Sequence, residues 1–234
     1  MALKLQYLNS NDIGVFAKLT NSYCLVADKK CKNYNIIDSE LISIPIVETT
    51  ICGMNIVGRI TAGNKYGLLV PSTLTEKEYR NLIENLPEEI IIKKVDEKLS
   101  ALGNVICCND YVAIVHPEIS AQVVEEIKDT LNVEVFRTTI NNNVLVGSYC
   151  VVTNLGGIVH PEVGINELEE LYNIFQIPLA PGTINKGCDL IGSGCLINDS
   201  IGFVGNQTTT VEITLVDGVF KLNKYNYTRY NCSV

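Results

Sequence analysis

The chain has 234 residues, 47% of them hydrophobic and 19% charged, so it can bury a full core as one large domain or two small ones. Its formal net charge of −8 argues against broad electrostatic binding to nucleic acid and suits a basic protein partner. We expect a soluble intracellular protein, because the segment from residue 1 has no secretory pattern and no apolar run approaches the ~20 residues that span a bilayer.

The nine cysteines are an odd number and never form a C-x-x-C pair. Most lie in apolar runs that read as strands, such as "SYCLV", "VICCN" and "SYCVV". We therefore predict buried reduced thiols rather than a disulfide or zinc framework, which fits a cytosolic or nuclear compartment.

Five segments of the chain resemble one another. Each begins with a glycine followed six or seven positions later by an asparagine, as in "GVFAKLTNSYCLV" from Gly14 and "GNVICCNDYVAIVHP" from Gly103. The anchoring asparagines are Asn21, Asn64, Asn109, Asn154 and Asn198, spaced 43, 45, 45 and 44 residues apart. A period near 44 over almost the whole chain predicts five repeated units, each with two short strands joined by an asparagine turn.

Three amphipathic helices follow the paired strands. The patterns "TEKEYRNLIENL", "EISAQVVEEIKDTL" and "INELEELYNIF" place apolar residues on one face and charges on the other, so the helices should lie on the outside. Thr75 with Glu78, and Asn166 with Glu169, have the spacing of capping signals. The first unit has only "DSEL" where its helix belongs, and "NQTTTVEITLV" in the last unit shows no clear amphipathic helix.

A further strand follows each helix, in "EEIIIKKV", "VEVFRTTI" and "QIPLAPGTI". The expected fold is therefore α/β: five strand-strand-helix-strand blades that close into one propeller-like ring with helices around the rim. The end units should differ because they must complete each other's sheet. We assign residues 1–224 to this domain and 225–234 to a short C-terminal tail.

No enzyme, cofactor site or metal site is predicted. His116 and His160 occupy the same place in two units, each before a proline, so their role is structural. Cys107 and Cys108 lie in a repeated strand, and no nucleotide-binding glycine loop is present. Carboxylate pairs such as Glu125 with Glu126 lie on exposed helix faces, where a solvated surface explains them better than acid-base chemistry.

A candidate binding face follows from the repeat. Five positions before each anchoring asparagine lie Phe16, Arg59, Asn104, Tyr149 and Ser193, which should form a ring at one end of the domain. Their chemistry differs completely, which indicates contact with an asymmetric partner; the alternative is that they fill the mouth of the ring. Lys18, Lys65 and Lys94 lie near the ends of their units or strands and should add local positive charge.

The segments "DIGVFAKLTNSYCLVA", "IVGRITAGNKYGLLVP", "EKLSALGNVICCNDYVAIVHP" and the closing "GVFKLN" resemble the family of eukaryotic translation initiation factor 6 from about residue 1 to 224. The resemblance implies a pentein fold, a five-bladed pseudo-symmetric ring. It also implies a ribosome anti-association factor that binds the intersubunit face of the large (60S) ribosomal subunit, acts in its late maturation and prevents premature joining of the small (40S) subunit.

The partners implied by the resemblance are the C-terminal end of a large-subunit protein and the sarcin-ricin loop of the rRNA. Release is expected from an elongation-factor-like GTPase with the Shwachman-Bodian-Diamond protein. The resemblance implies a monomer in cytoplasm, nucleus and nucleolus, without membrane contact. Arg59, Asn104 and Tyr149 match ribosome-facing positions of the family, and we predict that Arg59→Ala weakens binding by ~1–3 kcal/mol without unfolding.

The chain departs from animal members of the family at two places. It stops after "KYNYTRYNCSV", and it has Tyr172 and Asn173 where they have a phosphorylatable serine pair, so control by phosphorylation is not expected. Two other functions stay open: a guanidine-modifying pentein enzyme of the deiminase or amidinotransferase type, and a scaffold protein unrelated to ribosomes.

Overall fold

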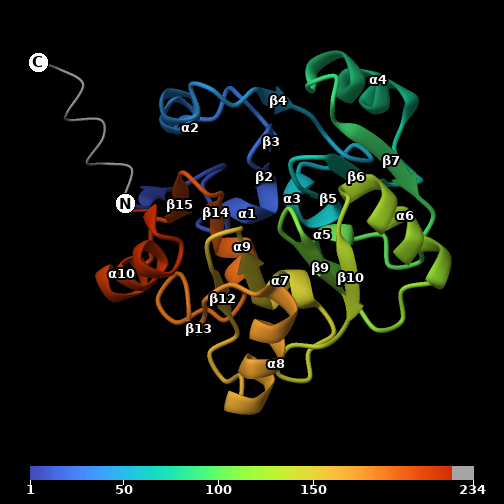
Figure 1. The fold of residues 1–234 in the computed structure, drawn as a ribbon. Helices are drawn as coiled ribbons and strands as arrows, with labels where there is room; N and C mark the ends of the chain where they lie inside the picture. Colours follow the sequence, from blue (N-terminus) through green and yellow to red (C-terminus); the bar gives the residue numbers. More distant parts are fainter. Residues whose placement is uncertain (223–234) are drawn as a thin grey trace, which may run out of the picture.

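Five three-stranded sheets surround a central axis in the computed structural model, which describes residues 1–222 (Figure 1). In each sheet the first two strands are antiparallel and the third pairs in parallel with the second. The strands are β2 (Ala17–Leu19), β3 (Cys24–Val26) and β4 (Ile46–Glu48); β5 (Ala62–Gly63), β6 (Gly67–Pro71) and β7 (Ile91–Val95); β8 (Ile106–Cys108), β9 (Val112–Val115) and β10 (Glu134–Arg137); β11 (Cys150–Val152), β12 (Gly157–Val159) and β13 (Leu179–Pro181); β14 (Cys195–Ile197), β15 (Gly202–Gly205) and β1 (Leu3–Leu5). The five-bladed α/β ring predicted from the repeat is confirmed.

The central strand of each sheet is buried along its whole length. β6 reads GLLVP and β9 reads VAIV, with every residue buried, because neighbouring strands and an outer helix cover them on all sides. Such continuous apolar runs are typical of strands with no solvent-facing side. The second strand predicted in each unit is therefore this buried central strand.

Five four-residue helices form an inner ring around the axis (Figure 1). They are α1 (Ile13–Phe16), α3 (Val57–Ile60), α5 (Leu102–Val105), α7 (Val146–Tyr149) and α9 (Ile191–Gly194), and each leads directly or through one residue into the first strand of a blade. The sequence predicted strand from the glycine onward, which is wrong for these residues. A single helical turn is too short to show a helical period.

Five longer helices cover the outside of the ring (Figure 1). The predicted α4 (Glu76–Asn85), α6 (Ala121–Leu131) and α8 (Ile165–Phe175) are confirmed. The end units also carry helices, α2 (Tyr34–Glu40) and α10 (Thr210–Val219), which the sequence did not predict. The sequence did not predict α10, because its apolar residues do not gather on one face. Thr209 and Glu212 nevertheless form a capping box at its start.

One of the two capping signals predicted from the sequence is confirmed. Thr75 and Glu78 form the predicted capping box of α4. Asn166 lies inside α8, which begins at Ile165 after Gly164, so the predicted cap there is wrong.

The two ends of the chain close the ring. β1 pairs in parallel with β15 and completes the last sheet, and the backbone N–H of Ala2 donates to the Asp217 carboxylate in α10. The prediction that the end units complete each other's sheet is confirmed for the last sheet, whereas the first sheet contains only β2, β3 and β4 of its own unit. The boundary at residue 224 and the tail 225–234 lie outside the described residues. Within residues 1–222, no helix combines the length and apolar character needed to cross a bilayer.

Candidate functional site

The turn between the first two strands has one structural position in all five units. The side-chain oxygen of Asn64 accepts from the backbone N–H groups of Tyr66 and Gly67, and Asn109 and Asn198 make the same pair of bonds. In the first and fourth units the hydroxyls of Thr20 and Thr153 take this place. The structural anchors are therefore Thr20, Asn64, Asn109, Thr153 and Asn198, each six residues after its glycine.

Two of the anchors read from sequence are consequently one residue out of register. Asn21 and Asn154 stand one residue after the true turn positions, Thr20 and Thr153. The sequence pattern did not separate the two, because threonine and asparagine offer the same kind of short-range acceptor. Arg59, Asn104 and Ser193 occupy the third position of their helices, whereas Phe16 and Tyr149 occupy the fourth. The five candidates share one end of the ring, but they are not equivalent positions, and this part of the prediction is wrong.

Arg59 points inward and holds the inner helices together. Its Nε donates to the carbonyl oxygen of Gly14 in α1 at 3.2 Å, and its Nη1 donates to that of Gly147 in α7 at 3.1 Å. Burial lowers the pKa of the guanidinium to about 10. Arg59 thus links three units of the ring, a role that the sequence did not reveal.

The other four candidates are, like Arg59, partly exposed at this end. Asn104 accepts a hydrogen bond from the Ser148 hydroxyl at 3.2 Å, and the Tyr149 ring meets the edge of His160 with centroids 5.3 Å apart. Phe16 packs near Tyr7, and the Ser193 hydroxyl donates to the carbonyl of Leu190. Their positions are set by neighbours in the ring, while part of each side chain stays available to a partner.

An apolar rim surrounds these residues. Ile56, Leu145 and Leu190 each stand immediately before an inner helix, and their exposed fractions are 37%, 39% and 38%. Met54 and Val144 lie beside them and are exposed to 45% and 39%. Equivalent positions of a ring lie at one height around its axis, so these side chains share one level in three of the five units, whereas Asp12 and Ala101 stand there in the other two.

We call the inner-helix candidates together with this rim the helix-end face. Exposed apolar groups arranged around one surface mark interaction sites more often than scattered single residues do. Sequence reasoning missed the rim, although an apolar residue stands before the glycine-containing turn of three units and could have signalled it.

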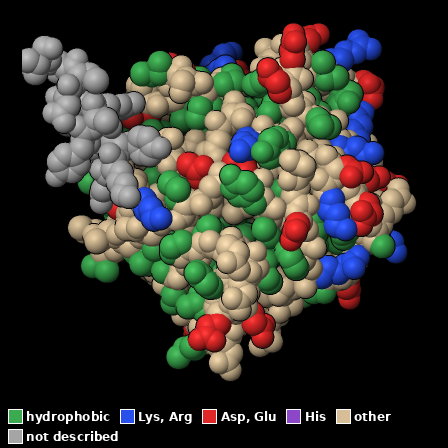
Figure 2. Space-filling view, viewed as in Figure 1, with side chains coloured by type: hydrophobic (Ala, Val, Ile, Leu, Met, Phe, Trp, Pro, Cys, Tyr) green, Lys and Arg blue, Asp and Glu red, His purple; other side chains and the backbone are tan. Residues whose placement is uncertain are grey.

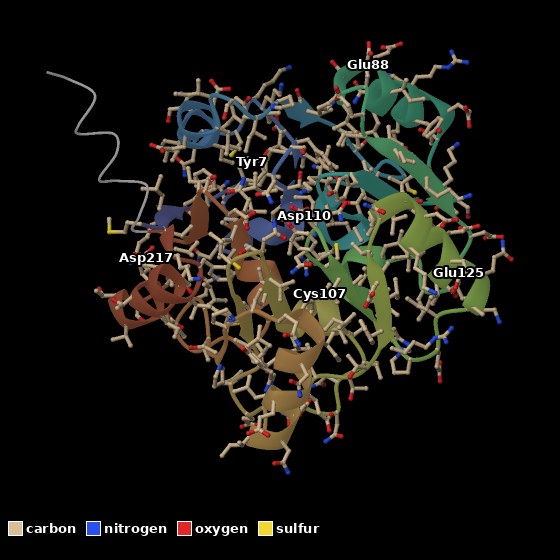
Figure 3. The ribbon with its side chains drawn as sticks, in the orientation of Figure 1. Tyr7, Glu88, Cys107, Asp110, Glu125 and Asp217 are labelled. Carbon is tan, nitrogen blue, oxygen red and sulfur yellow. The ribbon has the colours of Figure 1, made fainter. Side chains whose placement is uncertain are left out.

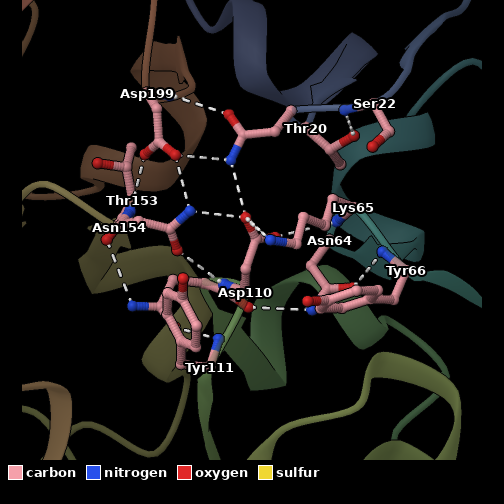
Figure 4. Close-up of polar contacts among 12 residues, drawn as sticks. Thr20, Ser22, Asn64, Lys65, Tyr66, Asp110, Tyr111, Thr153, Asn154 and Asp199 are labelled. Atoms are coloured by element: carbon pink, nitrogen blue, oxygen red, sulfur yellow. Dashed lines mark hydrogen bonds and ion pairs between the residues drawn. The ribbon is translucent and has the colours of Figure 1, made fainter.

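A polar ring closes the opposite end of the axis (Figure 4). The amide nitrogens of Asn21 and Asn154 each donate to both Asp110 and Asp199, at 2.6 to 2.9 Å. Lys65, the fifth equivalent residue, donates its backbone N–H to Asp110, and its amine lies 3.8 Å from the same carboxylate. Asn21, whose place in the turn was misread, therefore belongs to a network that ties the units together.

Lys65 and Lys94 do not join the helix-end face. The strand β5 and the turn residue Asn64 lie between the inner helix α3 and Lys65, whose amine lies 4.8 Å from the centroid of the Tyr66 ring. Lys94 lies on β7, where its amine pairs with Glu76 at 2.6 Å. Figure 2 shows basic side chains along the edge over α6, β7 and β10, interspersed with acidic ones, so they form no continuous basic patch.

A cavity of about 80 Å³ lies on the axis between the two ends. Cys107, Cys150 and Cys195 line it together with Lys18 and Arg59, and Figure 3 places Cys107 and Asp110 near the middle of the ring, far from Glu88 and Glu125. The described cysteines are free thiols: Cys24, Cys107, Cys150 and Cys195 are buried as predicted, whereas Cys31, Cys52, Cys108 and Cys188 are partly exposed. No group of metal-binding side chains is found within residues 1–222.

The two histidine side chains accept hydrogen bonds from nearby backbone N–H groups. The Nδ1 atoms of His116 and His160 accept from the N–H groups of Glu118 and Glu162, at 3.0 and 3.1 Å, and both rings are buried. These equivalent contacts confirm the structural role predicted from the repeat.

Comparison with known proteins places the whole ring in one family. The family model described as "eIF-6 family" matches residues 2–219. The chain is 54% identical to "Eukaryotic translation initiation factor 6" of Tetrahymena thermophila over 96% of this chain and 92% of that protein. It is 51% identical to the Saccharomyces cerevisiae protein of the same name, over 95% of this chain and 91% of that protein.

One solved structure shows a much weaker similarity to the chain. A crystal structure of dimethylarginine dimethylaminohydrolase, as an adduct with S-methyl-L-thiocitrulline, has a TM-score of 0.47 and 11% identity over 90% of this chain and 75% of that chain. This similarity is too low to bear on function. The match over residues 2–219 and the identities above 50% decide the assignment: the chain belongs to the eIF-6 family of translation initiation factors.

Proposed function

We propose that this protein binds the intersubunit face of the large (60S) ribosomal subunit, acts in its late maturation and sterically prevents premature joining of the small (40S) subunit. The observation that carries the proposal is membership of the eIF-6 family over residues 2–219. Such a factor inhibits by occupying area that the small subunit needs, so its strength is set by its affinity for the large subunit.

The helix-end face is the docking surface in this proposal. It combines the partly exposed side chains of Asn104, Tyr149 and Phe16 with the exposed aliphatic side chains of the rim. Protein interfaces have a similar composition, with apolar and aromatic residues in the core and polar residues around it. The partners are the C-terminal end of a large-subunit protein and the adjoining sarcin-ricin loop region, with release by an elongation-factor-like GTPase and the Shwachman-Bodian-Diamond protein. Such a factor would act as a monomer in cytoplasm, nucleus and nucleolus.

The proposal includes no catalysed reaction. The axial cavity supports this over guanidine-modifying chemistry, because it contains two cationic side chains, Lys18 and Arg59, that would repel a guanidinium substrate. Asp110 and Asp199 already accept hydrogen bonds within the polar ring.

Sedimentation with salt-washed 60S and 40S subunits tests the proposal. Wild-type protein should co-sediment with 60S subunits alone and reduce 80S formation. Leu145→Glu, at the apolar rim, should weaken 60S binding by ~10-fold or more, because it places a charge in a desolvated contact. Ile83→Glu is the matched control, since Ile83 is an exposed apolar residue of the outer helix α4.

Equal binding by Leu145→Glu and Ile83→Glu would remove the helix-end face from the interface. Failure of the wild type to bind 60S subunits would overturn the function itself. Turnover of arginine-like substrates in a citrulline or ammonia assay would favour the enzyme instead.

A further inference from the structure

Lys18 places a cation inside the ring. It lies in the middle of β2, between the buried Ala17 and Leu19, and alternate residues of a strand point to opposite sides. Its side chain lines the axial cavity. The residues four positions after the glycines of the other units are Ala62, Cys107, Val151 and Leu196, so the first unit alone has a charge there.

Asp110 also lines the cavity, but its carboxylate accepts from the amides of Asn21 and Asn154 and lies beside the Lys65 amine. Lys18 forms neither a hydrogen bond nor an ion pair in the described part of the chain, whereas every fully enclosed nitrogen or oxygen there has a partner. The amine therefore opens onto the cavity. Arg59 lines the same cavity, and its hydrogen bonds go to the uncharged carbonyls of Gly14 and Gly147.

Both cations are held at an energetic cost. Burial lowers the pKa of Lys18 and of Arg59, and each also lowers the pKa of the Cys107 thiol beside them, after the larger effect of its hydrogen bond with Cys150. Two like charges that face one partly buried cavity favour a negative counter-charge between them.

The cavity limits the size of such a counter-charge. A volume of about 80 Å³ holds several water-sized molecules, each of which needs ~10–15 Å³ by this measure. That space suits a halide or a compact oxyanion and excludes a nucleotide or a peptide. The thiols of Cys107, Cys108 and Cys195 already donate to backbone carbonyls, so Lys18 and Arg59 are the cationic groups of the lining.

We propose that the axial cavity is a binding site for one small inorganic anion, held by the Lys18 ammonium with the Arg59 guanidinium beside it. Because Arg59 also bridges the inner helices, a bound anion would stabilise the closed ring. The inference rests on the cavity and does not depend on the proposed ribosomal function.

Thermal unfolding of the full chain tests this proposal. Gluconate, which is too large for the cavity, is replaced stepwise by chloride, bromide, bicarbonate or phosphate at constant pH and ionic strength. The unfolding temperature of the wild type should rise and saturate with at least one of the small anions, and comparing the series separates halides from oxyanions. Lys18→Met should lose the saturable rise, and Lys93→Met, which removes a surface lysine paired with Glu126, should keep it.

Bromide diffraction on wild-type crystals provides a test without a variant. The anomalous signal should show a bromide between Lys18 Nζ and the Arg59 guanidinium. A rise of equal size in Lys18→Met, or no difference between gluconate and every small anion, would overturn the proposal and leave the Cys107 thiolate as the counter-charge. A bromide peak without any saturable effect in solution would mean binding at crystal concentration only, which also counts against the site.

Discussion

Gly58 and Gly103 approach each other so closely that a Cβ atom on Gly103 would lie 2.3 Å from the Gly58 carbonyl oxygen. The same contact recurs around the axis, with each inner-helix glycine facing the carbonyl of the preceding one, and Gly14 facing Gly192 closes the circle at 2.3 Å. The repeated glycines are therefore required by the spacing of the inner helices rather than by a turn.

Gly103→Ala should lower the free energy of unfolding by about 1–3 kcal/mol, because two backbones must separate to admit the methyl group. Gly218→Ala is the control, since nothing lies within 4 Å of a Cβ at that position in α10 and alanine favours a helix interior. Urea unfolding of both variants measures the difference. Equal stability of Gly103→Ala and wild type would show that the ring can expand without cost.

Arg59→Ala should destabilise the fold by about 1.5–3 kcal/mol, because the carbonyls of Gly14 and Gly147 lose a charged donor inside the ring. This differs from the expectation, drawn from sequence, that the variant binds more weakly without unfolding. Chemical denaturation gives the stability, and sedimentation with 60S subunits at a temperature where the variant is folded gives the affinity. Unchanged stability with weaker binding would restore the simpler role as a contact residue.

Glu78 should make stability depend on pH in the acidic range. Burial opposes ionisation of this carboxyl, but hydrogen bonds from the Gly53 N–H and from Thr75 and Thr50 outweigh it and lower the pKa from 4.5 to about 2. The unfolded chain thus binds a proton before the folded one does. The stabilisation is fully present above pH 4.5 and is lost as the pH falls toward 2.

The stability difference between wild type and Glu78→Gln should therefore shrink as the pH falls through this window. Glu84→Gln, at an exposed carboxylate of the same helix, should show no such pH dependence. Denaturant unfolding at a series of pH values measures both differences. A constant difference for Glu78→Gln would mean that the ionised carboxylate contributes nothing.

Asp110→Asn should weaken the polar ring. The Asp110 carboxylate accepts from the amides of Asn21 and Asn154 and lies beside the Lys65 amine, so an amide in its place loses charge-assisted bonds to three units. We expect a loss of about 1.5–3 kcal/mol in the free energy of unfolding. Asp129→Asn, on the exposed side of α6, serves as the control in thermal or urea unfolding, and an equal effect of both variants would contradict the network role.

Local patterns predicted most of the blades. The buried strands β6 and β9 are continuous apolar runs, and α4 and α8 have apolar faces, so a few neighbouring residues carry enough information. The sequence did not predict the helix α2, because its seven residues, "YNIIDSE", make too few turns to show a helical period. The helix-end candidates Asn104 and Tyr149 were found by alignment of the repeats, even though the alignment was one residue out in two units.

The sequence by itself determined the number of units, the strands and three outer helices within them, and the family to which the chain belongs, because repetition and hydrophobic periodicity are properties of short segments. Only the tertiary structure decided that Thr20 and Thr153 replace asparagine as turn anchors, that Arg59 points inward, and that Lys65 lies at the opposite end of the axis from Tyr149. The turn bonds of Thr20 and Thr153 are local, but threonine and asparagine can both make them, so the sequence left their register open. The contacts of Arg59 and of the polar ring join residues 44 or more positions apart in the chain. These long-range contacts depend on how the closed ring places side chains around its axis, which no local pattern encodes.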